Sequence, residues 1–195
     1  MITTLKIRLE PNNKQKSLLF QSAGTARWAY NWTLARQAEN YKNGKSFIQD
    51  GDLRRELTQL KKTKELQWLN NYSCDIPKQA IKDAYKAYIR FFKGQANKPK
   101  FKSKKKSKPA FYQDNFKVKF YNGKILLSKI GWINLSEKYR IPEDSQYSNI
   151  RITFNGVHWF ASIGVEIDNI QPKLTNESLG IDIGLKDLAI CSNGK

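Results

Sequence analysis

The sequence predicts an α+β protein in which a β-domain is interrupted by a block of helices. Apolar residues alternate with polar ones in residues 3–9, then recur at helical spacing, and alternate again beyond residue 115. A strand that precedes a helical block needs partners for its backbone groups, and later strands can supply them. We therefore expect residues 1–10 and 110–171 to form one β-domain, with residues 11–94 as an inserted helical domain.

The first predicted element is a half-buried strand. Leu5, Ile7 and Leu9 alternate with the basic residues Lys6 and Arg8. A Pro-Asn-Asn sequence follows and ends the strand.

Two helices are expected next. The segment from about Lys14 to Tyr41 is apolar almost continuously, which indicates burial on more than one side, and Gly24 is a candidate break into two helices. Asn43-Gly44 is a turn. Asp52 is the expected N-cap of a short helix with a single apolar stripe, formed by Leu53, Leu57 and Leu60.

A third helix is predicted to open at Ser73 or Asp75, with Pro77 in its first turn, and to end at Gly94. Aromatic rings recur along it between basic residues. Such rings either pack in a core or stack on unpaired bases. Their helical spacing favours the core for Tyr88 and Phe91 and leaves both readings open for Tyr85.

A basic loop, residues 95–109, is expected after the helices. Residues 93–109 contain eight lysines, two prolines and no acidic residue, and the whole chain has a formal net charge of +18. A charge this large is best neutralised by a polyanion, of which nucleic acid is the commonest, although a merely solvated charge run is the alternative. The candidate phosphate contacts are Lys98, Lys100, Lys102, Lys104, Lys105, Lys106 and Lys108.

The rest of the β-domain is expected to be built from hairpins. Phe116, Val118 and Phe120 alternate with lysines and lead into Asn122-Gly123, a sequence typical of a type I′ turn. Asn155-Gly156 marks a second hairpin. His158, the single histidine, follows that turn, and a structural role is favoured for it.

After an expected linker at residues 172–178, a carboxylate interrupts a short apolar strand in Gly180-Ile-Asp-Ile-Gly184. A buried Asp182 would need a partner, which could be a metal ion, a lysine or a turn backbone. Asp187 is interpreted as a solvated turn residue.

The composition also bears on the cellular compartment. No apolar run is long enough for a transmembrane helix, and the N-terminus has no apolar signal core, so a cytoplasmic protein without a membrane partner is expected. An anionic membrane surface stays the main rival to nucleic acid. Cys74 and Cys191 are far apart in sequence and are interpreted as reduced thiols.

Four segments together resemble the TnpB (OrfB) family of insertion-sequence RNA-guided nucleases, the ancestors of type V CRISPR effectors. The last of them, GIDIGLKDLAICSNG at residues 180–194, resembles the family's first RuvC catalytic motif. The others follow the family's order: LKIRLEPNNKQKSLL at 5–19, ARWAYNWTL at 26–34 and NKPKFKSKKK at 97–106. The resemblance covers the whole chain.

The resemblance implies a wedge-type β-barrel interrupted by a helical recognition domain, followed at residues 179–195 by the start of a RuvC-like nuclease domain. It implies guide RNA and target DNA as partners, and Arg27 and Arg36 lie in the segment that helps to form the family's recognition surface. It also implies Mg²⁺ as cofactor, held by three carboxylates, of which Asp182 alone matches a residue of this chain. The family's cysteine-rich zinc element has no counterpart here.

We therefore expect an N-terminal part of such a nuclease that binds RNA and DNA but does not cut alone. Two alternatives stay open. One is a nuclease-dead, RNA-guided repressor, and the other is a stand-alone protein that binds transposon ends through a helix-turn-helix in residues 14–62.

Overall fold

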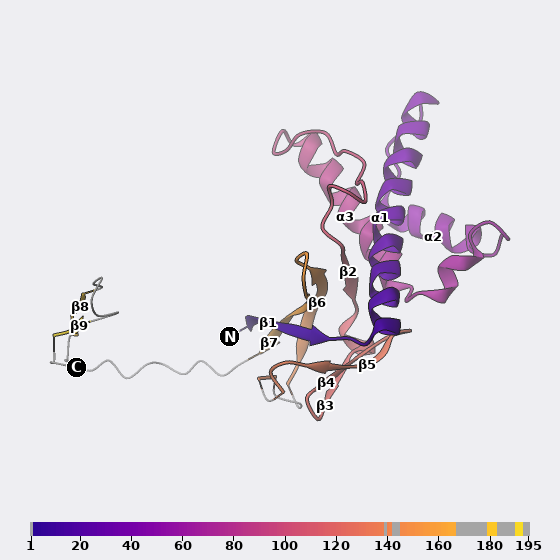
Figure 1. Cartoon of the computed structure of the whole chain (residues 1–195). Helices are drawn as coiled ribbons and strands as arrows, with labels where there is room; N and C mark the ends of the chain where they lie inside the picture. The colour runs from indigo at the N-terminus through magenta and orange to yellow at the C-terminus, as the bar shows by residue number, and fades with distance from the viewer. Residues whose placement is uncertain (1, 139, 142–144, 167–178, 183–189, 193–195) are drawn as a thin grey trace.

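The computed structural model describes residues 2–138, 140–141, 145–166, 179–182 and 190–192. One strand comes first, then helices, then strands, as Figure 1 shows. The elements are β1 (Ile2–Glu10), α1 (Asn13–Lys42), α2 (Asp50–Leu60), the 3₁₀ turn η1 (Gln67–Asn71), α3 (Asp75–Phe92), β2 (Ala110–Gln113), the 3₁₀ turn η2 (Asn115–Lys117), β3 (Lys119–Tyr121), β4 (Lys124–Leu127), β5 (Gly131–Leu135), β6 (Tyr147–Phe154), β7 (Trp159–Glu166), β8 (Ile181–Asp182) and β9 (Ile190–Cys191).

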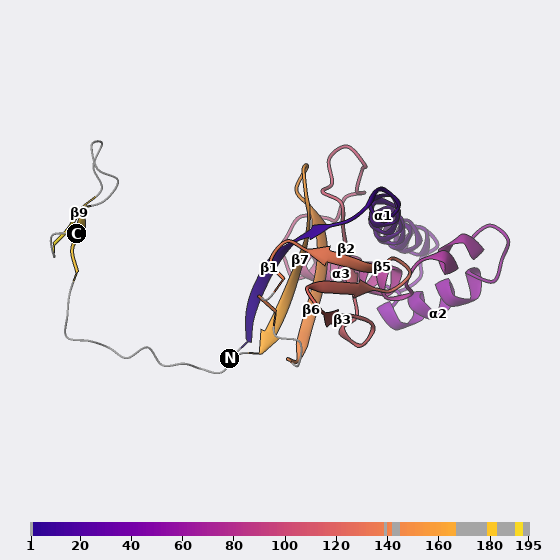
Figure 2. The same cartoon turned by 60° about the horizontal axis from the view of Figure 1, so that its bottom comes forward.

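The first strand pairs with strands that follow the helices, as predicted. β1 runs antiparallel to β7 from the pair Ile2–Glu166 to the pair Leu9–Trp159, and Leu9 also pairs with Leu135 of β5. The sheet has seven antiparallel strands in the order β2-β6-β7-β1-β5-β4-β3. Figure 2 shows the helices gathered to one side of it.

The sheet curls around a buried core. The Phe120 ring of β3 lies 4.6 Å from the Tyr147 ring of β6, although the two strands are far apart in the sheet order. The side chain of Asn115 donates a hydrogen bond to the Tyr147 carbonyl across the same approach. The fully buried side chains of this core include Ile7, Phe111, Ile125, Leu127, Ile133, Ile150 and Ile152.

Helix α1 is continuous over 30 residues, so the predicted break at Gly24 is wrong. Asn12 and Gln15 form a capping box at its start. The helix packs on three neighbours in turn, and that burial outweighs the cost of about 1 kcal/mol for an interior glycine. Leu19 and Ala23 enter the sheet core, Ala29, Tyr30 and Leu34 pack on α3, and Trp28 and Trp32 join the α2 cluster.

The other two helices begin close to the predicted positions. Gln49, not Asp52, is the N-cap of α2, and its side chain makes no capping hydrogen bond. Asp52 lies instead in the first turn, where its carboxylate pairs with Arg55 at 3.1 Å. Helix α3 begins at Asp75 and ends before Gly94, whose φ of +68° is the left-handed conformation expected of a terminating glycine.

Both predicted hairpins form, but the strand predicted to contain Phe116 is wrong at that residue. Asn122 and Gly123 both have positive φ, as a type I′ turn requires. The Asn155-Gly156 hairpin also forms, but Asn155 closes a wider turn, in which its side-chain oxygen accepts from the amides of Val157 and His158. Phe116 was predicted to lie in a strand; it lies in η2 instead and is 90 % exposed.

Two strands near the end of the described chain form a separate pair. Ile181 pairs with Cys191, and Asp182 pairs with Ile190. The predicted linker at 172–178 and the turn residue Asp187 lie outside the described residues.

Candidate nucleic-acid interface

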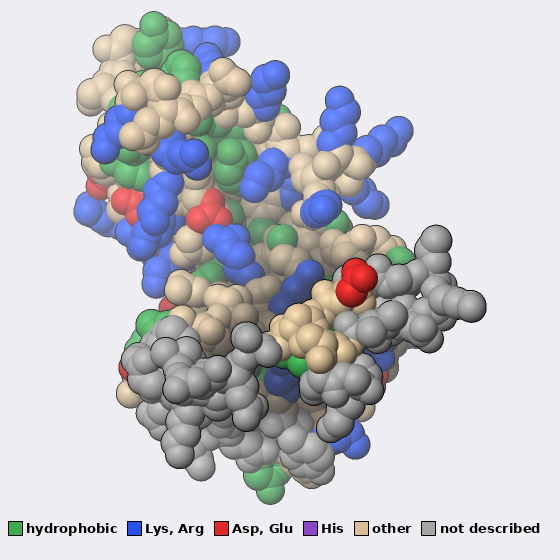
Figure 3. Space-filling model, turned by 90° about the vertical axis from the view of Figure 1, so that its left-hand side faces the viewer, with side chains coloured by type: hydrophobic (Ala, Val, Ile, Leu, Met, Phe, Trp, Pro, Cys, Tyr) green, Lys and Arg blue, Asp and Glu red, His purple; other side chains and the backbone are tan. Residues whose placement is uncertain are grey.

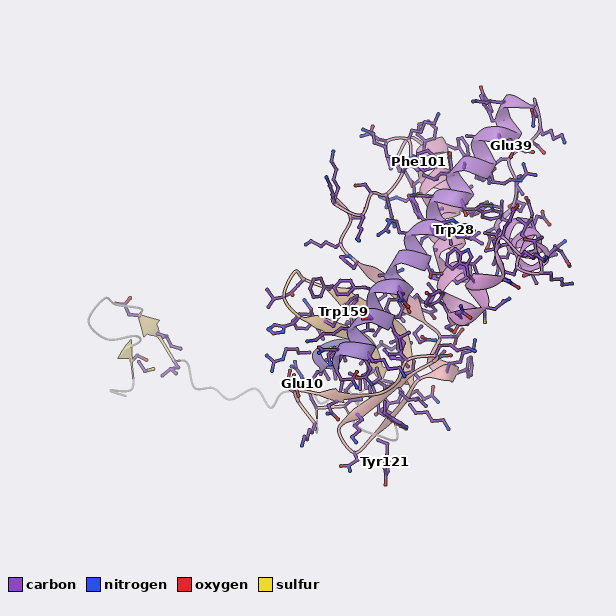
Figure 4. The ribbon with its side chains drawn as sticks, turned by 45° about the vertical axis from the view of Figure 1, so that its right-hand side comes forward. Glu10, Trp28, Glu39, Phe101, Tyr121 and Trp159 are labelled. Carbon is purple, nitrogen blue, oxygen red and sulfur yellow. The ribbon has the colours of Figure 1, made fainter. Side chains whose placement is uncertain are left out.

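The basic loop is fastened to α1 rather than solvated throughout. The amide of Asn31 accepts from the backbone N–H of Lys102 at 2.8 Å and donates to the Lys102 carbonyl at 2.9 Å. This pair of bonds fixes the middle of the loop beside the middle of α1. Figure 4 shows the consequence: Phe101, in the loop, lies toward the same end of the molecule as Glu39 of α1, away from Trp159 and Glu10.

Lys102 differs from the other lysines of the loop. Its ammonium nitrogen lies 3.9 Å from the centroid of the Tyr30 ring, a cation–π contact. Desolvation lowers the pKa of Lys102; the Asp83 carboxylate opposes that shift, and the Arg151 guanidinium adds to it. Lys102 therefore helps to hold the loop on the helix, and the lysines that follow it, Lys104, Lys105, Lys106 and Lys108, are exposed.

Those later lysines form one wall of a groove that we term the basic groove. Arg27 of α1 lines the same groove, so the structure brings together Arg27 and four of the seven predicted lysines. Of the described residues that line it, none is acidic. They are Ser17, Phe20, Gln21, Ala23, Arg27, Lys104, Lys105, Lys106, Ser107, Lys108, Pro109, Phe154, Asn155 and Gly156.

Figure 3 views the side on which this loop lies, with lysine and arginine side chains spread over it and few acidic ones among them.

Two aromatic rings lie in the basic groove, and the sequence did not point to either. The Phe20 ring is 45 % exposed and makes edge contacts with Phe154 and Trp159, with centroids 5.0 Å apart in each case. Phe20 comes from α1 and Phe154 from the end of β6. An exposed ring beside ammonium groups can stack on a base while the lysines meet the phosphates.

A smaller pocket adjoins the groove and contains one acid. Arg27 and Lys102 line it together with Asp83 and Arg151. The Arg151 guanidinium pairs with the Asp83 carboxylate at 3.2 Å and so ties β6 to α3. Arg27 thus lines both the pocket and the basic groove.

The remaining predicted residues do not join the basic groove. Arg36 pairs with Glu56 of α2 at 2.7 Å and with Glu39 at 3.3 Å, and the hydrogen bond with Glu56 is the largest cause of its raised pKa. Lys98 lines a different groove, at the ends of α1 and α3. Lys100 is exposed and lines neither groove. A nucleic-acid role stays a prediction for these three residues, as it does for the residues that line the basic groove.

Asp182 lies on β8 and is exposed. Among the described residues no group of three His, Cys, Asp or Glu side chains could hold a metal ion. A single carboxylate does not form a Mg²⁺ site, because hard divalent ions in such sites need several oxygen ligands. The role of Asp182 as a metal ligand therefore stays a prediction.

A groove lined by basic residues and free of acidic ones among its described lining is typical of nucleic-acid-binding proteins. No helix among the described residues is long and apolar enough to cross a membrane. Residues 1–46 match the model of a helix-turn-helix domain of the IS605 OrfB family. In this chain the matched segment contains β1 and the single continuous helix α1.

Two curated relatives align with nearly the whole chain. "Putative RNA-guided DNA endonuclease InsQ" of Escherichia coli K12 is 29 % identical over 194 residues, which are 99 % of this chain and 48 % of the relative. A "Putative RNA-guided DNA endonuclease" of Streptomyces pristinaespiralis is 26 % identical over 193 residues, 97 % of this chain and 48 % of the relative. The resemblance to the TnpB (OrfB) family is confirmed, and the chain spans about half the length of these relatives.

Proposed function

We propose that this chain is the nucleic-acid-binding part of a TnpB-type RNA-guided DNA endonuclease and that it binds guide RNA and target DNA. The observation that carries the proposal is the basic groove. Arg27 and the exposed Phe20 ring line it together with four lysines, and no described lining residue is acidic. The four lysines are Lys104, Lys105, Lys106 and Lys108. Such a groove attracts phosphates and leaves a ring available for a base.

The fold supports the same proposal. A curled antiparallel sheet that carries an inserted helical unit agrees with the wedge and recognition domains that the family resemblance implies. The loop that bears the lysines connects α3 of the inserted unit to β2 of the sheet. A ligand in the groove would therefore contact both parts of the fold at once.

Nucleic-acid co-purification tests the proposal directly. The 195-residue chain is purified at low salt, and the bound nucleic acid is extracted, treated with RNase or DNase and sequenced. Guide binding predicts a discrete structured RNA encoded beside the gene. Recovery of no nucleic acid, or of random fragments alone, would contradict it.

A stand-alone DNA-binding function is the second candidate, favoured by the match of residues 1–46 to a helix-turn-helix domain model. It predicts specific binding to duplex transposon ends without RNA. Electrophoretic mobility shifts with RNase-treated protein distinguish the two functions, because a guide-dependent protein loses sequence-specific DNA binding and an end-binding protein keeps it.

We propose that DNA cleavage by the whole nuclease uses Asp182 as one Mg²⁺ ligand. The support is its place in the family-like motif at 180–194. The remaining ligands would have to come from other residues. Among the residues that the structure describes, no group of three His, Cys, Asp or Glu side chains could hold a metal ion.

A further inference from the structure

A second groove lies where α1 and α3 both end, and it shares no lining residue with the basic groove. We term it the tip groove. Two of its walls are the C-terminal ends of the helices, and the third is the loop that follows α1. The residues that matter for its chemistry are Tyr41, Lys42, Lys45, Phe47, Phe92 and Lys98.

Two buried amides build the groove by holding that loop. Gln37 donates from Nε2 to the Ile48 carbonyl at 2.7 Å and accepts from the Ile48 amide at 3.1 Å. Asn40 donates to the Ser46 carbonyl. Gly44, with a φ of +67°, lets the chain reverse after α1. The side chains of two buried residues therefore fix the conformation of the short loop that follows α1.

The held loop inserts Phe47 among the rings of α3. Phe47 meets Tyr88 and Phe92 edge-on, with centroids 5.5 and 5.2 Å apart. Phe92 is stacked on Tyr88 at 5.9 Å yet remains 59 % exposed, and Tyr41 on the facing helix is 83 % exposed. The inner rings thus fix the orientation of Phe92, while Phe92 and Tyr41 present ring surface to the solvent.

The charges around these rings have one sign. Lys42, Lys45 and Lys98 line the groove, and none of its described lining residues is acidic. The carbonyl ends of two helices point toward this region and disfavour an anion there. The lysines must therefore supply any attraction for phosphate, and the rings supply the rest of the affinity.

We propose that the tip groove binds unpaired nucleotides of a nucleic-acid strand, with bases stacked on Phe92 and Tyr41 and phosphates held by the three lysines. The proposal rests on the proposed function and adds to it a second contact that is specific for single strands. A second copy of this chain is a poorer occupant, because docking would bring two sets of lysines together on a chain of net charge +18.

Fluorescence anisotropy of a labelled single-stranded oligouridylate of about ten nucleotides tests the proposal. Phe92→Ala should weaken binding about 5- to 100-fold, and Tyr41→Ala should weaken it less. Phe92→Trp should retain binding, since a larger ring still stacks. The matched control is Phe116→Ala, because Phe116 is also an exposed phenylalanine beside a lysine but lies in η2. This variant should bind like the unmodified chain.

Photo-crosslinking of the unmodified chain gives an independent readout. A 5-iodouridine oligomer should attach to peptides that contain Tyr41 or Phe92. Full binding by Phe92→Ala together with an absence of these crosslinks would overturn the tip-groove inference. In that case, loss of oligomer binding in Lys104, Lys105 and Lys106 variants would still support the proposed function through the basic groove. An unmodified chain that binds no RNA overturns both. If analytical ultracentrifugation shows that the unmodified chain is a dimer and that Phe92→Ala is a monomer with unchanged RNA binding, the tip groove is a protein interface and the inference is overturned.

Discussion

The ammonium nitrogen of Lys117 lies 2.9 Å from Oδ1 of Asp75, whose side chain is only 6 % exposed. The pair joins the start of α3 to η2 across 42 residues of sequence. Ser73 and Gln113 donate to the other carboxylate oxygen at 3.0 and 3.2 Å. Burial raises the pKa of Asp75, but the hydrogen bonds from Lys117 and Ser73 and the Lys117 charge together outweigh burial, so the pKa is lowered.

This pair predicts acid sensitivity of the fold. Since the folded-state pKa of Asp75 is depressed, its contribution to stability is present above the unfolded-state value of about 4 and is lost as the pH falls through the folded-state pKa. Lys117→Met should lower the free energy of unfolding by about 1–3 kcal/mol at neutral pH, because it removes a partner of a buried charge. Urea unfolding measures both effects.

The matched control is Lys124→Met, which removes an exposed ammonium from β4. It should change stability by less than about 0.5 kcal/mol. A Lys117→Met deficit that stays the same size as the pH falls through the folded-state pKa of Asp75 would contradict the electrostatic account, since protonation of Asp75 removes the partner charge.

Two glycines in left-handed conformation predict unequal costs for alanine. At Gly123 (φ +66°) an added Cβ would lie 2.7 Å from Cβ and Cγ of Lys138, whereas at Gly44 (φ +67°) it would meet nothing within 4 Å. Gly44→Ala should therefore cost about 1 kcal/mol from backbone strain alone. Gly123→Ala should cost about twice as much or more, because strain and a clash add. Equal unfolding midpoints for the two variants would show that the Lys138 contact is easily relieved.

Binding of RNA should depend steeply on salt through the basic groove. Replacement of Lys104, Lys105 and Lys106 by serine should reduce the slope of log K against log salt by about 2–3, because each lost phosphate contact removes about 0.7–0.9 from it. The control replaces Lys119, Lys124 and Lys129, three exposed lysines around β3 and β4. An equal change in the control slope would mean that net charge, and not the groove, determines the affinity.

The anchor of the basic loop predicts a different signature. Asn31→Ala removes both hydrogen bonds to Lys102 but no charge. RNA affinity should fall about 3- to 10-fold with an unchanged salt slope, because the loop must then be ordered on binding. Hydrogen exchange should quicken at residues 100–106. The control is Asn70→Ala, which removes a bond to the Lys61 carbonyl elsewhere. A reduced salt slope for Asn31→Ala would contradict this prediction, because it would show that the loop lysines no longer contact the phosphates.

The cleavage proposal is tested in a protein of the full length of the curated relatives. Asp182→Asn should abolish Mg²⁺-dependent cleavage and leave RNA binding unchanged, because a metal ligand is lost and no basic residue is. Asp187→Asn, five residues further on in the same motif, is the matched control and should still cut. Residues 1–195 alone should not cut. Guide-dependent cleavage by them that is lost with Asp182→Asn would mean that further ligands lie within these residues or come from a second subunit.

Local patterns in the sequence predicted much of this molecule. The alternation in β1, the helical spacing of α3 and the Asn122-Gly123 turn are properties of neighbouring residues, and each was found in the structure. The four family-like segments likewise indicated a relative of TnpB, in agreement with the curated relatives, whereas a nucleic-acid role for the lysine run stays a prediction. Local preference failed at Gly24, where packing on three sides keeps α1 intact, and at Phe116, which lies in η2 next to the Lys117 that Asp75 holds.

The tertiary structure alone decided which residues form each surface. Phe20 and Phe154 are in contact although they are 134 positions apart in the sequence. Lys102 differs from the other lysines of the loop because it contacts Tyr30 and Asn31 of α1. Phe92 is exposed while Tyr88, four residues earlier on the same helix, is buried. Periodicity records only whether a side chain suits a helix or a strand. Which rings are buried, and which lysines remain free, depends on the path of the backbone that returns to cover them, and that path is set by packing between distant segments.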